Sequence, residues 1–273
     1  MNLKTQFDAV AARKRALDFR KRILDVSQKV TALHIASAYS CMEIVEMIYF
    51  GLMRFDGKTP LDTFIMSKGH GCLAQYMSLE RLGILSREDI DNYCKPNGIL
   101  GTHPDYGVPG IEAATGSLGH GMAIGVGMAY ADKIAKSDRM TYVVLSDGEL
   151  NEGSTWEAMM LAPSFNVTNL IAFVDNNDFQ SLGRTSETLP NFYPVVEKAE
   201  AFGWQCIELN GHSATTMIEA IQKKTPGKPL MLNCKTTKGK GVSYMENVPI
   251  WHYRSPNADE YQKALQELKE IWE

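Results

Sequence analysis

Two apolar runs, each ending in polar residues, constrain the fold of this chain most. Residues 142–145 (YVVL) lead into Ser-Asp147-Gly, and residues 170–174 (LIAFV) lead into Asp-Asn-Asn177. A helix-like segment, about 152–162, lies between them. This order is typical of a βαβ unit, whose two strands run parallel. Because ligands bind at the carboxyl ends of parallel strands, we expect Asp147 and Asn177 to face one crevice.

The polar residues of this unit suit a cation that carries phosphates. One carboxylate, one amide oxygen and a nearby backbone carbonyl are a ligand set that Mg²⁺ completes with water and phosphate oxygens. Gly148 permits a close backbone approach, and the helix that follows can hold a phosphate at its N-terminus. An Asp-Gly pair after a strand is usually only a turn. Both strand ends together predict a magnesium diphosphate site.

The same stretch resembles a known family. A strand that ends in Asp147-Gly, followed by an Asn pair after a second strand, resembles the thiamine diphosphate motif, with Ser146 where a Gly usually stands. The segments DGELNEG (residues 147–153), Glu157-Ala and NLIA from Asn169 resemble transketolase sequences. The resemblance implies thiamine diphosphate with Mg²⁺ (or Ca²⁺). The metal ligands that it implies are Asp147, Asn177 and Phe179, and it adds cofactor contacts at Gly148, Glu149 and Glu157.

Four histidines match active-site positions of this family. His70, in Ser-Lys-Gly-His, and the late His252 would contact the diphosphate and the substrate. His103, in Thr-His-Pro, would bind the hydroxyl and carbonyl end of a ketose donor. His34 matches a family His but lacks the glycines and proline that flank it in transketolases. The sequence His34-Ile-Ala-Ser is closer to that of deoxyxylulose-phosphate synthases. His34 is therefore either an active-site or a structural residue.

A glycine-rich segment, residues 114–121 (ATGSLGHG), provides further expected cofactor contacts. In the family the backbone of Gly116 holds the aminopyrimidine, and Leu118 packs on the cofactor rings. Ser117 belongs to the same segment, although the family more often has Pro there. The glycines at 121, 125 and 127 fall inside a helical pattern, which favours close helix–sheet packing over a dinucleotide-binding fingerprint.

The remaining pattern predicts one α/β domain over residues 1–273. Strands near 63, 142, 170, 204 and 230 alternate with helices, which indicates a doubly wound parallel sheet with helices on both faces. An N-terminal helical extension covers about residues 1–30, with periodicity from about 5 to 30, and its many basic residues are expected on a solvated face or at a subunit contact. Residues 235–241 (KTTKGKG) form either a phosphate-binding loop or a solvated basic turn. His212, in a turn, is expected to be structural.

Composition narrows the class of protein. With 44% hydrophobic residues among 273 the chain can bury a core, and a net charge of −4 gives no nucleic-acid or membrane-binding bias. Five cysteines without a Cys-x-x-Cys pair favour reduced thiols in a cytoplasmic protein. No signal peptide and no apolar run of membrane-spanning length are expected.

The resemblance runs from about Lys14 to Trp272 and covers only the diphosphate-binding, N-terminal part of a transketolase. The family takes its cofactor-activating Glu from a pyrimidine-binding domain, and Glu152 matches a position that relays to that Glu across a subunit interface. We therefore expect the N-terminal subunit of a two-gene transketolase, paired as α2β2 with a C-terminal subunit. It would transfer a two-carbon ketol unit from a ketose (phosphate) to an aldose (phosphate).

Other functions stay open. The chain could be a subunit of another thiamine diphosphate enzyme, such as the alpha subunit of a 2-oxo acid dehydrogenase or a deoxyxylulose-phosphate synthase. The set of His70, His103 and His252 favours sugar substrates over 2-oxo acids. A scaffold subunit without catalysis is a further alternative, and the intact pair of Asp147 and Asn177 argues against it.

Overall fold

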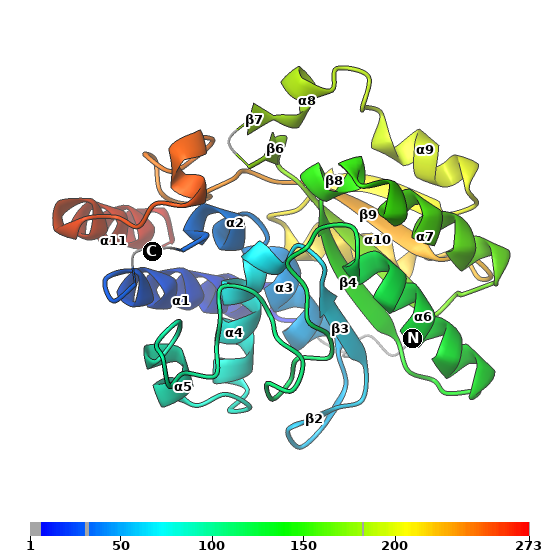
Figure 1. The fold of residues 1–273 in the computed structure, drawn as a ribbon, viewed down its shortest axis with the longest axis horizontal. Coiled ribbons are helices and arrows are strands. Elements are labelled where there is room, and N and C mark those ends of the chain that lie inside the picture. Colours follow the sequence, from blue (N-terminus) through cyan, green and yellow to red (C-terminus); the bar gives the residue numbers. More distant parts are fainter. Residues whose placement is uncertain (1–6, 31–32, 182, 273) are drawn as a thin grey trace.

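Five parallel strands form the central sheet of the computed structural model, which describes residues 7–30, 33–181 and 183–272 (Figure 1). Every strand pair in this sheet is parallel. The strand order is β3 (Thr63–Met66), β4 (Thr141–Ser146), β5 (Leu170–Asn176), β9 (Leu230–Lys235) and β8 (Gln205–Asn210). The five predicted strands and the parallel sheet are confirmed.

Helices cover both faces of this sheet, as expected for a doubly wound fold (Figure 1). Alternate residues of a strand point to opposite faces, so Tyr142 and Val144 of β4 join one core, whereas Val143 and Leu145 join the other. One face is covered by α6 (Gly121–Ile134), α7 (Gly153–Ser164) and α9 (Val195–Ala201). The opposite face is covered by α1 (Ala9–Ser27), α3 (Met42–Met47), α4 (Cys72–Arg81), α10 (Ala214–Gln222) and α11 (Ala258–Trp272).

A close approach of helix to strand explains one of the glycines in α6. A Cβ atom on Gly125 would lie 2.5 Å from Cγ2 of Val143 in β4, so any larger residue would push the helix off the sheet. This confirms the packing interpretation for that glycine. Around Gly127 the structure has nothing within 4 Å of such an atom, so the interpretation is wrong there.

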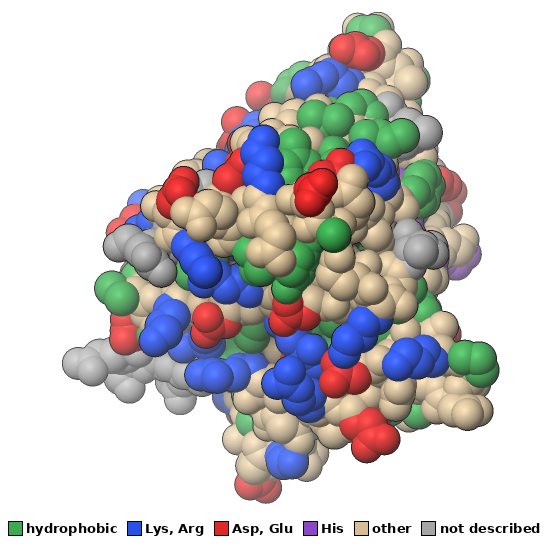
Figure 2. Space-filling model, turned by 90° about the vertical axis from the view of Figure 1, so that its left-hand side faces the viewer, with side chains coloured by type: hydrophobic (Ala, Val, Ile, Leu, Met, Phe, Trp, Pro, Cys, Tyr) green, Lys and Arg blue, Asp and Glu red, His purple; other side chains and the backbone are tan. Residues whose placement is uncertain are grey.

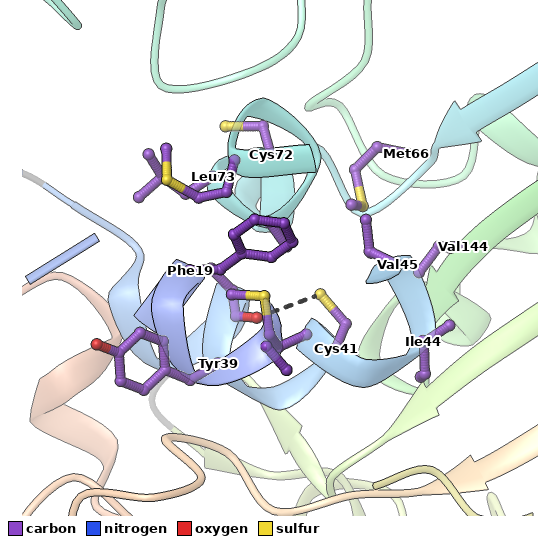
Figure 3. Close-up of a cluster of buried hydrophobic side chains, with 14 of the residues drawn as sticks. Phe19, Tyr39, Cys41, Ile44, Val45, Met66, Cys72, Leu73 and Val144 are labelled. Carbon is purple, nitrogen blue, oxygen red and sulfur yellow. Dashed lines mark hydrogen bonds between the residues drawn. The ribbon is translucent and has the colours of Figure 1, made fainter. Parts of the chain in front are cut away.

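The N-terminal helix packs into the core. Figure 3 shows Phe19 of α1 among side chains of α2 (Ile35–Ser40), α3 and α4. The Asp8 side chain caps the helix by accepting hydrogen bonds from the backbone N–H groups of Val10 and Ala11. Residues 5 and 6 of the expected helix lie outside the described residues.

The expectation of a solvated basic face is wrong for part of α1. Arg20 is fully buried, and Arg15 and Arg22 form ion pairs with Glu46 of α3 and Glu80 of α4. Periodicity places these side chains correctly around the helix. It does not reveal that neighbouring helices carry carboxylates that cover the basic side of α1.

Short elements connect the main ones. They are α5 (Arg87–Asp91), α8 (Thr185–Thr188), the π-helical turn η1 (Ile48–Leu52), the 3₁₀ turns η2 (Gly69–Gly71), η3 (Gly148–Asn151) and η4 (Pro249–His252), and two hairpins, β1 (Phe55–Asp56) with β2 (Thr59–Pro60) and β6 (Phe179–Gln180) with β7 (Gly183–Arg184). The sequence pattern does not predict α2, α4 or α5. Three of the turns, η2, η3 and η4, lie at the carboxyl edge of the sheet and carry predicted site residues.

The visible surface mixes charges of both signs. Figure 2 shows Lys and Arg side chains interspersed with Asp and Glu on one face of the molecule. Each of the five cysteines is free in the structure. In the described part of the chain, the helices are too short or too polar to cross a bilayer.

Candidate active site

The carboxyl ends of β4 and β5 bring the expected metal ligands to one edge of the sheet. The two strands are paired with Ser146 opposite Asp175, so Asp147 and Asn177 follow neighbouring strand ends. The backbone carbonyl of Phe179, in the hairpin that follows, lies against Gly148: a Cβ atom on that glycine would be 3.3 Å from the carbonyl oxygen. The absence of a side chain at Gly148 lets the hairpin approach this closely.

Asp147 has the environment of a cation ligand. Its carboxyl group is fully buried, and burial together with the charge of Asp175 raises its pKa to about 6. Oδ2 accepts hydrogen bonds from Thr185 (3.2 Å) and Tyr193 (3.1 Å), whereas Oδ1 has no hydrogen-bond partner in the described part of the structure. A buried carboxylate oxygen without a partner is costly, and a divalent cation would remove that cost.

Asn177 is oriented by its neighbours. Its amide nitrogen donates to Oγ of Ser40 (2.8 Å), and its Oδ1 accepts from the backbone N–H of Phe179 (3.0 Å). A carbonyl oxygen has two lone pairs, so Oδ1 can accept this bond and still ligate a metal. Among the described residues, no three His, Cys, Asp or Glu side chains form a metal site by themselves. The residues present therefore fit Mg²⁺ that brings phosphate oxygens of its own.

The four predicted histidines gather around one cavity. The ring centroid of His34 lies 5.8 Å from those of His70 and His103 and 5.1 Å from that of His252. The cavity has a volume of about 190 Å³. Its lining consists of the four histidines together with Gly116, Leu118, Ser146, Gly148, Phe179, Gln180, Ser181 and Tyr253.

Burial keeps the imidazoles of His34, His70 and His252 neutral. Burial lowers the pKa of His34 to about 4 and that of His252 to about 3, with further lowering by nearby Lys238. Burial and the charge of Lys68 hold the pKa of His70 well below its usual range. At neutral pH each of these three rings is thus uncharged and presents one donor and one acceptor nitrogen.

The burial of Lys238 distinguishes the two interpretations of residues 235–241, a phosphate-binding loop and a solvated basic turn. Its side chain is 2% exposed, so this part of the loop is not a solvated turn. Its Nζ lies 2.8 Å from Nδ1 of His252 and donates to the carbonyl of Ser181 (3.1 Å). Burial and the charge of Lys68 lower the pKa of Lys238 to about 7. Neither of these two contacts is with a carboxylate, so the protonated form of Lys238 is available to an anionic ligand, which would in turn favour protonation.

Comparisons with known proteins show the family to which this chain belongs. Residues 12–269 match the family described as "Transketolase, thiamine diphosphate binding domain". The chain belongs to the transketolase family. It is 41% identical over 257 residues to an apulose-4-phosphate transketolase subunit of Phocaeicola vulgatus, covering 92% of this chain and 91% of that protein. It is 35% identical to the 6-deoxy-6-sulfo-D-fructose transketolase subunit SqwG of a Clostridium species, covering 92% and 93%.

Solved transketolases have the same fold over part of their length. The transketolase of Campylobacter jejuni superposes with a TM-score of 0.88 at 26% identity and covers 97% of this chain, and that of Leishmania mexicana gives 0.85 at 28% identity and 94% coverage. This chain spans 43% and 41% of those two proteins, whereas it spans nearly the whole of the two relatives that are named as subunits. As a transketolase family member it corresponds to the thiamine diphosphate-binding domain.

Besides the expected metal ligands Asp147 and Asn177, four residues expected from the family lie outside the cavity lining. Ser117, Glu152 and Glu157 are exposed. Glu149 is buried and points to the glycine-rich segment, where it accepts hydrogen bonds from Ser67 and from the backbone N–H of Gly119 (3.0 Å). Burial raises the pKa of Glu149 to about 7 despite these bonds.

The sequence pattern does not predict a buried ion pair close in the chain to residues of the site. Nζ of Lys68 donates to Asp175, and both side chains are fully buried. Burial would lower the pKa of Lys68, but Asp175 outweighs it and the pKa is raised. Two features of the sequence point to the pair. Lys68 belongs to the Ser-Lys-Gly-His motif after an apolar run, and Asp175 follows the apolar run that precedes Asn177.

Three lining residues were also missed. Gln180 and Ser181 belong to the hairpin segment after Phe179, and Tyr253 follows His252. The Tyr253 ring packs edge-on against His252 at 4.4 Å and His34 at 5.2 Å between centroids. The pattern gave no signal for these residues, because the hairpin and the 3₁₀ turn that bring them to the cavity have no hydrophobic periodicity.

Proposed function

We propose that this chain is the thiamine diphosphate-binding subunit of a two-subunit transketolase that moves a two-carbon ketol unit from a ketose to an aldose. The observation that carries the proposal is the cavity itself, where a cluster of four histidines adjoins a buried carboxylate with an unpartnered oxygen. Neutral imidazoles suit a substrate rich in hydroxyls. Family membership supports the same function.

Cofactor and metal would be held at the strand ends. Asp147, Asn177 and the carbonyl of Phe179 would ligate Mg²⁺ (or Ca²⁺), and Lys238 with His70 would face the diphosphate. Gly116 and Leu118 line the cavity at the position proposed for the cofactor rings. When bound, thiamine diphosphate supplies the carbon centre that carries the two-carbon unit.

The histidines would bind the donor sugar. If the Lys238 ammonium donates to Nδ1 of His252, the ring proton of His252 sits on Nε2, where it can donate to a sugar hydroxyl. Nδ1 of His34 is buried and has no hydrogen-bond partner among the described residues, so it is available to a ligand. His103 and His70 complete the proposed contacts, and each neutral imidazole can donate one hydrogen bond to a sugar oxygen and accept another from a sugar hydroxyl.

We propose a partner that carries the pyrimidine-binding domain. Glu157 lies about one turn before the exposed apolar side chains Met160 and Leu161 of α7, which suit a subunit contact better than open solvent. Ser117 and Glu152 are exposed as well. Relatives of the same length are named as subunits of transketolases, which supports an assembly such as α2β2 with a C-terminal subunit. The free cysteines support a cytoplasmic location.

The donor is proposed to be a ketose with an anionic terminal group. Two relatives are named for apulose-4-phosphate and 6-deoxy-6-sulfo-D-fructose, which carry a phosphate and a sulfonate. Lys238 would serve the cofactor in this proposal, so recognition of the anionic end of the sugar would fall to the partner subunit.

Calorimetric titration of thiamine diphosphate with Mg²⁺, with and without the C-terminal subunit, tests the proposal. We expect tight binding and ketol transfer only when both subunits are present. Asn177→Ala should abolish cofactor-dependent transfer in the complex, because it removes a metal ligand. Asn191→Ala, a change in the loop before α9 and away from the cavity, is the control and should retain activity. Full activity of the single chain, or of the Asn177→Ala complex, would refute the proposal.

A further inference from the structure

The loop that carries Lys238 is anchored on both sides of that residue. The backbone N–H of Thr237 donates to Nε2 of His212 at 2.9 Å, and the N–H of Gly239 donates to the carbonyl of Ala36 at 3.0 Å. The carbonyl of Lys240 accepts from Nε of Arg20 at 3.1 Å. The backbone around Lys238 is thus held by groups outside the cavity, while its ammonium contacts Ser181 and His252, which line the cavity.

Two of these anchors lead to the same buried ion pair. The guanidinium of Arg20 in α1 donates to Glu43 of α3 at 2.5 and 2.9 Å. Arg20 is fully buried and Glu43 is 6% exposed. Burial alone would raise the pKa of Glu43, but Arg20 and His212 lower it to about 2, so the pair is fully charged at neutral pH. A bidentate Arg–carboxylate pair in such surroundings has a fixed geometry.

His212 connects the ion pair to the loop. Its Nδ1 lies 2.9 Å from Oε2 of Glu43, and its Nε2 accepts from the Thr237 N–H. A nitrogen that accepts carries no proton, so the ring proton is on Nδ1 and is donated to Glu43. Both ring nitrogens therefore have a defined role, and a carboxylate that fixes the tautomer of a histidine is a common way to orient it.

We infer that Arg20, Glu43 and His212 form a clamp that positions Lys238 for the cofactor diphosphate. None of the three side chains is among the described residues that line the cavity. They hold the backbone at two points, at Thr237 before Lys238 and at Lys240 after it. Holding the backbone on both sides of Lys238 fixes the direction of its side chain. The inference rests on the proposed function, because it assumes that Lys238 faces a diphosphate.

The clamp assigns a positioning role to the N-terminal helix. Arg20 comes from α1, His212 from the turn after β8 and Thr237 from the loop after β9, so three distant segments meet at one point. Nδ1 of His212 could satisfy its hydrogen bond with any acceptor, but only the ionised Glu43 joins it to the same guanidinium that holds Lys240. Loss of His212 should therefore free one side of the loop and leave the other side held.

Binding of thiamine diphosphate with Mg²⁺ to the two-subunit complex tests the clamp. His212→Ala should weaken cofactor binding about tenfold, the scale of one hydrogen bond that involves a charged network. The KM for the donor sugar should change much less. In a Lys238→Ala background, His212→Ala should cause no further loss, because residues that act through one another are not additive.

Ser213→Ala is the matched control. Ser213 is next to His212 and caps α10 by accepting from the N–H of Thr216, but its side chain has no hydrogen bond to residues 236–241 in the described structure. This variant should lose some stability and keep its cofactor affinity. An equal loss of affinity in Ser213→Ala, or additive losses for His212→Ala and Lys238→Ala, would overturn the inference.

Hydrogen exchange gives a second readout that does not depend on ligand or activity. The amides of residues 237 and 239 should exchange faster in His212→Ala, with the larger change at Thr237, and His212→Gln should restore part of the protection because its amide can accept the same bond. Unchanged protection in both variants would overturn the clamp. A complex that binds cofactor but transfers no ketol unit would refute the proposed function and leave this result standing.

Discussion

Two aspartates at neighbouring strand ends have opposite environments. Asp175, at the end of β5, accepts hydrogen bonds from Ser40, Lys68, Thr236 and Asn177. Asp147, one strand away, receives two bonds on Oδ2 and none on Oδ1 within the described structure. Both groups are fully buried. The same residue type in the same layer thus has an ammonium partner in one case and an unpartnered oxygen in the other.

This difference separates architecture from function. The bonds of Asp175 tie together α2, the end of β3, β5 and the loop after β9, so this carboxylate fixes the floor of the cavity. Asp147 lacks a cation among these contacts, and burial raises its pKa to about 6. An incompletely paired buried carboxylate costs stability, and a protein retains such a group where a ligand completes it.

The largest effect is expected from Asp175→Asn. This variant leaves the ammonium of Lys68 buried without its anion, and breaking a buried ion pair costs about 3–5 kcal/mol. Urea unfolding should report this loss in free energy of unfolding. Asp138→Asn is the control, because it breaks an ion pair with Arg54 in which the Asp138 side chain is 87% exposed, and it should change stability little. Equal stability of the two variants would contradict the structural role of Asp175.

Asp147→Asn should raise the free energy of unfolding, whereas Asp175→Asn lowers it. The folded pKa of about 6 lies above the ordinary 3.8, so ionisation of the buried group opposes folding. Without Mg²⁺, the variant should be more stable than the native protein by about 3 kcal/mol above pH 6. As the pH falls from 6 to 4 the native group is protonated in the folded state, and this advantage should disappear.

Unfolding of both proteins at pH 7.5 and pH 4.5 measures this prediction. The difference in free energy of unfolding between them is the relevant quantity, because the buried histidines affect both proteins equally. A variant that is less stable than the native protein at pH 7.5 would show that Asp147 is satisfied without a cation. Addition of Mg²⁺ with thiamine diphosphate should stabilise only the native protein.

A smaller effect is expected from Tyr193→Phe. The Tyr193 hydroxyl donates to Oδ2 of Asp147, so its loss should raise the pKa of Asp147 further and weaken Mg²⁺ binding about tenfold. Titration of Mg²⁺ at saturating thiamine diphosphate measures this change. Tyr261→Phe removes a similar bond, to Asp25 at 2.7 Å, far from the cavity and should leave Mg²⁺ affinity unchanged. Equal affinities in all three proteins would exclude a role for Tyr193.

The centre of the sheet could be predicted from the sequence because β4 and β5 are buried on both faces. The runs before Asp147 and Asp175 are continuously apolar, as parallel strands covered by helices require. The helices α2 and α4 were missed for a related reason. They are buried nearly all round, so they lack the polar side that makes helical periodicity visible.

The site was predictable in part. His70, His103 and His252 were named from motifs, and the structure gathers them with His34 around one cavity. Lys238 remained ambiguous, because a basic loop looks the same in a sequence whether its lysine is exposed or buried. The clamp could not be predicted from the sequence, because Arg20 and His212 are joined only through tertiary contacts that no local pattern encodes.

Helix α1 finds several of its partners at the other end of the chain. Arg20 bonds to Lys240 across 220 positions, Tyr261 of α11 bonds to Asp25, and Figure 1 shows α1 and α11 side by side. Contacts of such long range form late, because the intervening chain must be ordered first. On a ribosome, α1 emerges before α11 but completes its contacts only after α11 is made. Assembly of the cofactor loop should therefore come only after all five strands of the sheet have been made.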